Sequence, residues 1–200
     1  MAECFIDEIT GDITVNCDHM AVTGIESDIV LIPFGAEDKT GSAIDETNSQ
    51  LITDLVLKAG KTGFKLEGIK QTNSHNSEFV PGDNQTLDGH RHRIGFRILS
   101  PTTANRAEAN KLSKGGKYIA VVNRKYKGPS DQDAFLVLGW QYGMKLVEMT
   151  ENSLENKGAI VGALQSEDDA LEMDLPKNLL DADYDTTLTA FNNKFEQAAV

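Results

Sequence analysis

Short apolar runs separated by glycine and polar clusters recur through the second half of the chain. Residues 135–138 are continuously apolar, residues 144–149 alternate apolar with polar, and residues 159–164 are apolar again. Runs of this length are typical of β-strands. The pattern therefore predicts three successive strands, a meander, on which the other strands pack. Trp140 and Tyr142 lie in its first connection, where we expect them to cap the core.

The first half of the chain carries the same kind of pattern. Alternation in the strand that follows Gly63 predicts Phe64, Leu66 and Ile69 facing the core, with the charged residues between them facing water. Residues 34–48 are polar and are expected to form an exposed loop. Further strands are expected at residues 4–9, 13–17, 29–32, 50–57, 64–70, 90–99 and 118–122.

Two helices are expected among these strands. Thr102 or Thr103 can cap the first helix, which ends in a glycine pair after two lysines. The second helix follows Pro176 and has an aspartate at its start. Its apolar stripe consists of Leu188, Phe191 and Phe195.

The long stretch at residues 71–89 is rich in Asn, Ser, Gly and Asp, so we expect it to project as an arm or loop. Together these patterns predict a mainly β fold, namely a β-sandwich with one flanking helix, an extended loop or hairpin arm, and a C-terminal helix. Residues 1–176 would form the sandwich domain and residues 177–200 a helical extension. A length of 200 residues with 40% hydrophobic content suits one core.

Charge is distributed in blocks. The net charge is −12, and the blocks 1–57, 58–127, 128–147 and 148–200 carry −11, +9, −1 and −9. Folding could bring the acidic ends against the basic middle within one molecule, or an acidic face of one copy could meet a basic face of the next. The residues expected at contacts between copies are Lys58, Lys61, Lys65, Phe79, Arg91, Arg93, Glu167, Asp168 and Asp169.

The two cysteines, Cys4 and Cys17, have no partner at metal-ligand spacing, and we expect buried or half-buried free thiols. The acidic first residues do not resemble a secretory signal, and no apolar run approaches the roughly 20 residues that a membrane span needs. A cytosolic product with no membrane stage is expected. An acidic chain also argues against tight, base-reading contact with nucleic acid.

Candidate chemistry is sparse. His90 and His92 would point the same way on a strand and could bind a metal, but the neighbouring Arg93 and Arg97 would repel a cation. The acidic cluster at residues 167–169 lacks the spaced ligands of a calcium loop, so a solvated turn or an electrostatic contact is expected there. No nucleotide-binding or hydrolase motif occurs. We therefore expect no catalytic residues, no cofactor and no metal.

Several segments, taken in order, resemble the tail tube (major tail) proteins of tailed bacteriophages. They are GIESDIVLIPF at residues 24–34, the hairpin pattern at residues 52–74, HRIGFRIL at residues 92–99, GGKYIAVVNR at residues 115–124, and the long segment at residues 135–168. Each is a pattern of strands and turns, and the segments follow one another in order along most of the chain, from residue 24 to residue 168.

The resemblance implies a structural protein of the virion tail, assembled in the host cytoplasm. Six copies would close into a ring by strand pairing, and rings would stack into a hollow tube with other tail proteins at its ends. Double-stranded DNA would pass through the lumen without specific binding. One alternative is a head-tail connector or capsid-associated protein. A further alternative is a small metal-dependent β-barrel enzyme that uses His90 and His92.

Overall fold

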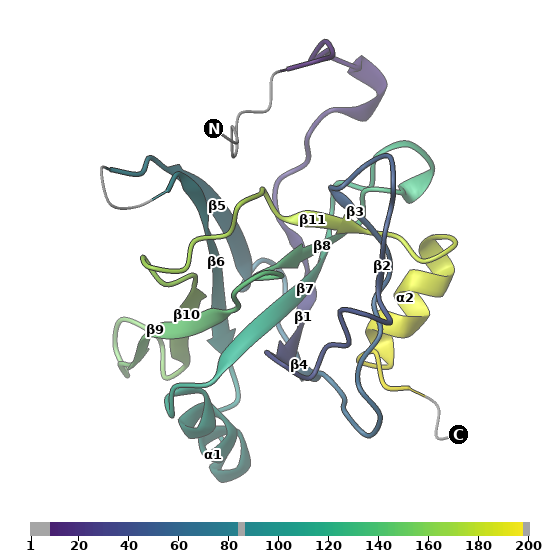
Figure 1. The fold of residues 1–200 in the computed structure, drawn as a ribbon. Coiled ribbons are helices and arrows are strands. Elements are labelled where there is room, and N and C mark those ends of the chain that lie inside the picture. The colour runs from purple at the N-terminus through teal and green to yellow at the C-terminus, as the bar shows by residue number, and fades with distance from the viewer. Residues whose placement is uncertain (1–8, 84–86, 198–200) are drawn as a thin grey trace.

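A single large sheet dominates the fold. The computed structural model describes residues 9–83 and 87–197, in which eleven strands form one mixed sheet beside two α-helices (Figure 1). The strands are β1 (Ile25–Pro33), β2 (Ala43–Ile44), β3 (Leu51–Asp54), β4 (Phe64–Leu66), β5 (Ser74–Val80), β6 (Gly89–Ile98), β7 (Lys117–Arg124), β8 (Phe135–Leu138), β9 (Met144–Glu151), β10 (Ile160–Gln165) and β11 (Lys177–Leu179). The helices are α1 (Thr103–Leu112) and α2 (Tyr184–Asn192), with 3-10 turns at Cys17–His19 and Pro129–Asp131. The predicted mainly β chain with one internal and one C-terminal helix is confirmed.

The strand order places the middle of the chain at the middle of the sheet. The path is β2-β3-β11-β8-β7-β9-β10-β6-β5, and β1 pairs with both β7 and β4. Among the pairings of the described strands, β11 with β3 is parallel and the others are antiparallel. β5 and β4 therefore lie at edges, far from β8.

The central strands β1, β7 and β8 bury side chains on both faces. Along β7, Ile119 and Val121 enter one core cluster, while Ala120 and Val122 enter another. The first cluster is closed by α2 through Phe191, and the second by side chains of β6, β10 and α1. Burial on both faces explains why these strands have nearly continuous apolar sequences. Each large apolar side chain buried there contributes about 1.5–3 kcal/mol.

β8 and β9 lie in line along one edge of β7. Leu138 pairs with Ala120, and Met144 pairs with Tyr118, so residues 139–143 loop out between two parts of one interrupted strand. The predicted meander is therefore wrong in its first half, because no described residue of β8 pairs with β9. Its second half is correct, since β9 and β10 are antiparallel neighbours.

Two glycines make this interruption possible. Gly139 and Gly143 have φ angles of +72° and +75°, which L-residues with side chains rarely adopt. The N–H of Gly143 donates to the carbonyl of Gly139 at 3.0 Å and closes the loop. A Cβ atom on Gly143 would lie 2.9 Å from the ring of Phe34, so the loop packs too closely for any other residue.

Both helices begin where the sequence predicts. The hydroxyl of Thr102 accepts from the N–H of Asn105 at 3.2 Å, and the carboxylate of Asp183 caps α2 in the same way. Phe191 is buried on α2, as predicted. Phe195 is also buried, but it lies beyond the end of α2 at Asn192 with a φ of +57°, so it is not part of the helical stripe that the sequence predicts.

The segment after Pro176 is part of the same core. It contributes β11, which lies between β3 and β8, before it forms α2. α2 packs on the first core cluster, on the right of Figure 1. The expected boundary at residue 176 therefore does not separate two hydrophobic cores.

The N-terminal segment differs from the prediction. The strand expected at residues 13–17 is absent, because residues 13–16 make no strand pairing and Cys17 begins the 3-10 turn at Cys17–His19. Cys17 is a free, exposed thiol, so the prediction of burial is wrong for it. Cys4 and nearly all of the strand expected at residues 4–9 lie outside the described residues.

The polar stretch at residues 71–89 is not a loop throughout. Its residues 74–80 form β5, which makes a hairpin with β6 in a register that places Glu78 opposite Arg91. Of the core residues expected in the strand after Gly63, Phe64 and Ile69 are exposed, because that strand ends at residue 66 and has a partner on one edge. Residues 34–48 form the expected loop but include the short strand β2.

Candidate functional site

Two of the three arginines of β6, Arg91 and Arg93, pair with carboxylates of the same subunit. The guanidinium of Arg91 pairs with the carboxylates of Glu78 and Asp168, the latter at 2.7 Å. Arg93 pairs with Glu148 at 2.8 Å. These contacts join β5, β6, β9 and the segment after β10. They support the intramolecular explanation of the charge blocks.

Glu167 occupies a second ion-pair cluster. Its carboxylate lies 2.5 Å from the ammonium of Lys117 and 3.0 Å from that of Lys145. The hydrogen bonds from Lys117 and then Lys145 hold the pKa of Glu167 below its ordinary value. Two residues of the acidic cluster at residues 167–169, Glu167 and Asp168, therefore pair with basic side chains of the same subunit.

The residues expected at contacts between copies have three kinds of environment. Five of them make ion pairs inside the subunit, namely Lys65 (with Asp28 at 3.3 Å), Arg91, Arg93, Glu167 and Asp168. Lys58 donates to the carbonyl of Gly35 at 2.7 Å. Lys61, Phe79 and Asp169 are exposed. Phe79 is the only large apolar residue of this set, and its ring meets the edge of His90 at 5.6 Å.

His92 is a buried structural residue. The N–H of Gly139 donates to its Nδ1 at 3.1 Å, so Nε2 carries the proton and donates to the carbonyl of Asp174 at 3.0 Å. Burial lowers the pKa of His92 to about 4, so the ring is neutral. Both ring nitrogens are held by the backbone, so a metal would have to displace one of these bonds. In the part of the chain that the structure describes, no three His, Cys, Asp or Glu residues gather at metal-ligand distances.

The loop at residues 139–143 is held from several directions. The carboxylate of Glu172 accepts from the N–H groups of Gln141 and Tyr142 at 2.8 and 2.9 Å. Burial raises the pKa of Glu172, and these two bonds oppose that shift. Lys39 donates to the carbonyl of Gln141 and lies over the ring of Trp140. Trp140 is buried, as expected of a core cap, whereas Tyr142 is exposed.

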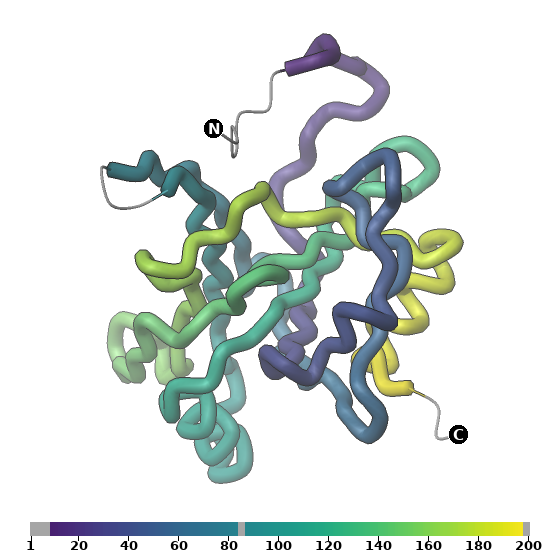
Figure 2. Tube along the Cα trace, viewed as in Figure 1, coloured from purple at the N-terminus to yellow at the C-terminus, as the bar shows by residue number. Residues whose placement is uncertain are grey.

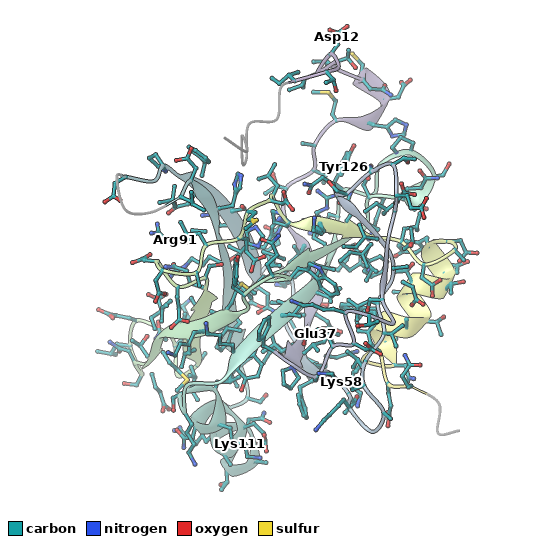
Figure 3. All side chains as sticks on the ribbon, in the orientation of Figure 1. Asp12, Glu37, Lys58, Arg91, Lys111 and Tyr126 are labelled. Atoms are coloured by element: carbon teal, nitrogen blue, oxygen red, sulfur yellow. The ribbon has the colours of Figure 1, made fainter. Side chains whose placement is uncertain are left out.

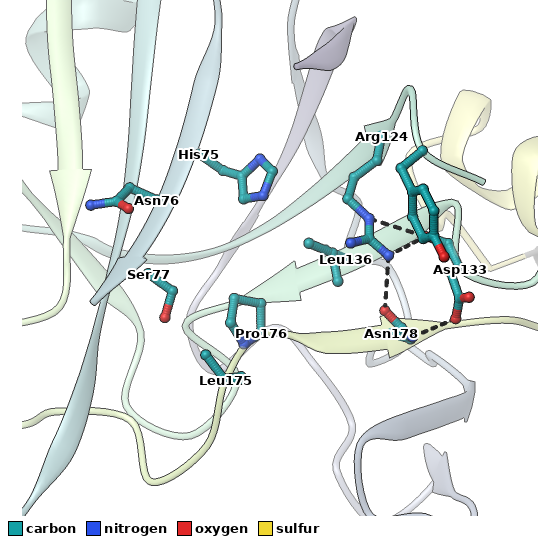
Figure 4. Close-up of a pocket in the computed structure, with 10 residues that line it drawn as sticks. His75, Asn76, Ser77, Arg124, Asp133, Leu136, Leu175, Pro176 and Asn178 are labelled. Atoms are coloured by element: carbon teal, nitrogen blue, oxygen red, sulfur yellow. Dashed lines mark hydrogen bonds between the residues drawn. The ribbon is translucent and has the colours of Figure 1, made fainter. Parts of the chain in front are cut away.

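A shallow hollow of about 520 Å³ lies between β5, β7 and β11 (Figure 4). Nε of Arg124 donates to the carbonyl of Asp133 at 3.0 Å, and the amide of Asn178 donates to the Asp133 carboxylate at 2.8 Å. Burial lowers the pKa of Arg124, and burial followed by the charge of Arg124 lowers the pKa of His75. Arg124, Asp133 and Asn178 are thus bonded to one another, and they tie the end of β7 to β11 past the intervening strand β8.

A larger groove, of about 830 Å³, lies between β4, β6 and α1. Its lining is mainly apolar and includes Phe64, Leu66, Ile69, Ile98 and Leu99. Three of these side chains, Phe64, Ile69 and Leu99, are exposed. Exposed apolar surface that is contiguous and concave is typical of an interaction site.

Two further features face outward. β5 pairs with β6 on one side, and its other edge has no partner within the described chain. Residues 9–24 leave the start of β1 as an extended arm that stands away from the body (Figure 2). The residue types of the arm were visible in the sequence, but its detachment from the sheet was not. The edge of β5, the groove and the arm together form the candidate assembly surface.

Comparison with protein families, with curated proteins and with solved structures finds no match for this chain. Neither of the helices in the described residues has the length and apolar character that crossing a membrane requires. The functional assignment therefore rests on the chemistry of the chain itself.

Proposed function

We propose that this protein is a structural subunit that self-assembles, as its resemblance to tail tube proteins implies. The assembly would consist of stacked rings of six copies around a channel for double-stranded DNA. In this proposal the sheet is a β-sandwich whose two layers enclose the second core cluster. The observation that carries the proposal is the open edge of β5.

β5 lacks the devices that usually block an edge strand. Natural edges carry lysines, prolines, bulges or a covering loop, because an open edge can pair with another chain. β5 has the sequence SHNSEFV over seven residues and contains no lysine or proline. Its one acid, Glu78, is paired with Arg91. A strand of a second copy can therefore add to this edge through main-chain hydrogen bonds.

The acidic character of the chain supports a channel role. A net charge of −12 repels phosphate groups, so a wall with this charge would let a duplex slide where a basic wall would retain it. The ion pairs of Arg91, Arg93 and Lys145 neutralise three cations within the subunit.

Negative-stain electron microscopy of the purified protein tests the proposal. Stacked rings or tubes are expected at high concentration and moderate salt. Single rings without stacking would favour the head-tail connector instead. A protein that remains a monomer under these conditions would contradict both assignments.

A matched pair of prolines tests the role of the β5 edge. Successive N–H groups of a strand point to opposite edges, so of Asn76→Pro and Ser77→Pro one removes an outward donor and the other removes a donor to β6. The outward variant should keep the thermal midpoint of the wild type and weaken assembly at least about tenfold, which is about 1.4 kcal/mol. Wild-type assembly by the variant that keeps its thermal midpoint would show that β5 is not the contact.

A further inference from the structure

The N-terminal arm at residues 9–24 carries apolar side chains that nothing in the described chain covers. Ile13 is 92% exposed and Val15 is 79% exposed. The two residues are two positions apart, a spacing that places both side chains on one side wherever the arm is extended, as it is at Asn16 and Met20. Met20 and Val22 repeat this spacing and are also exposed. An arm of this kind has the composition of a segment that is buried in an assembly.

The groove between β4, β6 and α1 has the complementary composition. Its floor and walls expose Phe64, Ile69 and Leu99. β4 pairs with β1 on one side, and its other edge has no partner in the described residues. An extended segment that enters the groove can therefore bury apolar side chains and also add a strand to β4.

Charge favours the same pairing. The arm contains Asp12 and Asp18 and no lysine or arginine, so it carries two negative charges. The groove is lined by two acids and four basic residues. One of the basic residues, Lys65, also pairs with Asp28 outside the lining at 3.3 Å, so the groove keeps a net positive charge. The acids are Glu67 and Glu108, and the basic residues are Lys65, Arg97, Lys111 and Lys194. Opposite net charges orient an encounter and fix its register.

The arm and the groove lie at opposite ends of the molecule. Figure 3 shows Asp12 on the arm at the top and Lys111 on α1 at the bottom. A contact between two different surfaces at opposite ends is heterologous, so it repeats from copy to copy instead of closing a dimer. An arm directed away from its own groove is placed to reach the groove of a neighbour.

We propose that residues 9–24 of one copy occupy the groove between β4, β6 and α1 of the next copy. This inference rests on the proposed self-assembly and adds a specific contact to it. The pairs Ile13 with Val15 and Met20 with Val22 enter the apolar groove, and Asp12 and Asp18 face its basic rim.

Cross-linking from Cys17 tests this contact in the full-length chain. Cys17 is an exposed thiol on the arm, so Cys4→Ser leaves it as the sole cysteine. Glu108→Cys or Glu67→Cys then places a second thiol on either wall of the groove. Mild oxidation should give a ladder of disulfide-linked dimers, trimers and longer chains on a non-reducing gel.

The matched control is Asp185→Cys in the same Cys4→Ser background. It also replaces an exposed acid on a helix, but it lies on α2, away from the groove. The control should give at most the Cys17 dimer that Cys4→Ser alone gives. A ladder from the control equal to that from the groove variants, or no ladder from either groove variant, would overturn the inference. A fast-migrating cross-linked monomer would place the arm in its own groove and would also overturn it.

A second pair of variants measures the contact without cross-linking. Ile13→Asp with Val15→Asp should weaken assembly about 100-fold or more and leave the thermal midpoint unchanged, because both side chains lie outside the folded body. Ile69→Glu in the groove should weaken assembly similarly. If the wild type forms rings or tubes and these variants do too, the arm contact is wrong and the proposed function stands. If the wild type is monomeric, the proposed function fails as well.

Discussion

The centre of the sheet and its periphery differ in how their side chains are used. β1, β7 and β8 are covered on both faces, and their large side chains are almost fully buried. β5 pairs with one neighbouring strand, and the arm at residues 9–24 pairs with none in the described chain. Both segments expose apolar and polar side chains. The centre holds the subunit together, whereas we propose that the periphery contacts other copies. Substitutions should therefore separate into those that affect stability and those that affect assembly.

The largest effect is expected in the centre. Phe135 is fully buried between β7, β11 and α2, so Phe135→Ala should lower the free energy of unfolding by about 3–5 kcal/mol. Ile13→Ala, on the arm, should change it by less than about 0.5 kcal/mol. Urea unfolding of both variants measures the difference. A comparable loss from both would mean that the arm belongs to the folded core.

The next largest effect is a pH dependence of stability caused by His92. The ring of His92 links β6 to the loop at residues 139–143. The folded pKa of His92 is about 4 against an ordinary 6.5, so the unfolded chain binds its proton first as the pH falls. The contribution of His92 to the free energy of unfolding is therefore fully present above pH 6.5. Between pH 6.5 and 4 this contribution decreases by roughly 3 kcal/mol.

The variant His92→Gln isolates this contribution, because its amide keeps a donor and an acceptor but does not titrate. Urea unfolding at pH 7 and pH 4.5 should show a smaller loss of stability for the variant than for the wild type. The side chains that act on His92 are His90, His75 and Asp174, and they remain in both proteins. Equal losses would show that His92 is not buried and neutral.

A smaller effect is expected at α1, which buries few side chains. Thr102 caps the helix, so Thr102→Ala should lower the free energy of unfolding by about 1 kcal/mol, whereas Thr102→Ser should restore most of it. Thermal unfolding followed by circular dichroism measures both variants. A loss above about 3 kcal/mol would show that α1 is as central to the fold as β7.

The smallest effect is expected from the ion pairs of the periphery. Arg93→Ala should cost less than about 1 kcal/mol, and added salt should reduce the difference, because the pair with Glu148 is partly exposed. The sequence-based prediction that Arg93 lies between copies gives a different result. In that case Arg93→Ala would weaken assembly while stability changes little, and sedimentation velocity would detect it.

The centre and both helices could be predicted from the sequence. The apolar runs at residues 29–32 and 118–122 and the caps at Thr102 and Asp183 are local signals, and local structure follows them. Local signals of this kind do not predict the position of the loop at residues 139–143 in the sheet. Its glycines suggest a turn, but pairing of both flanking strands with β7 depends on residues that are distant in the sequence.

The candidate assembly surface could be predicted only in part. β5 has no apolar face because it is an exposed edge, so its sequence has the composition of a loop. The charge blocks were visible, but the distances that pair Glu167 with Lys117 and Lys145 arise only after folding. Glu172 carries no sequence signal at all, because the loop that it holds lies about thirty residues earlier.

Above all, we propose that the exposed periphery joins copies of this chain. Sedimentation velocity of the wild-type protein over a range of concentrations tests it most directly. We expect a shift from the 21.8 kDa monomer to ring-sized and larger species as the concentration rises. A single monomeric boundary at every concentration would contradict it.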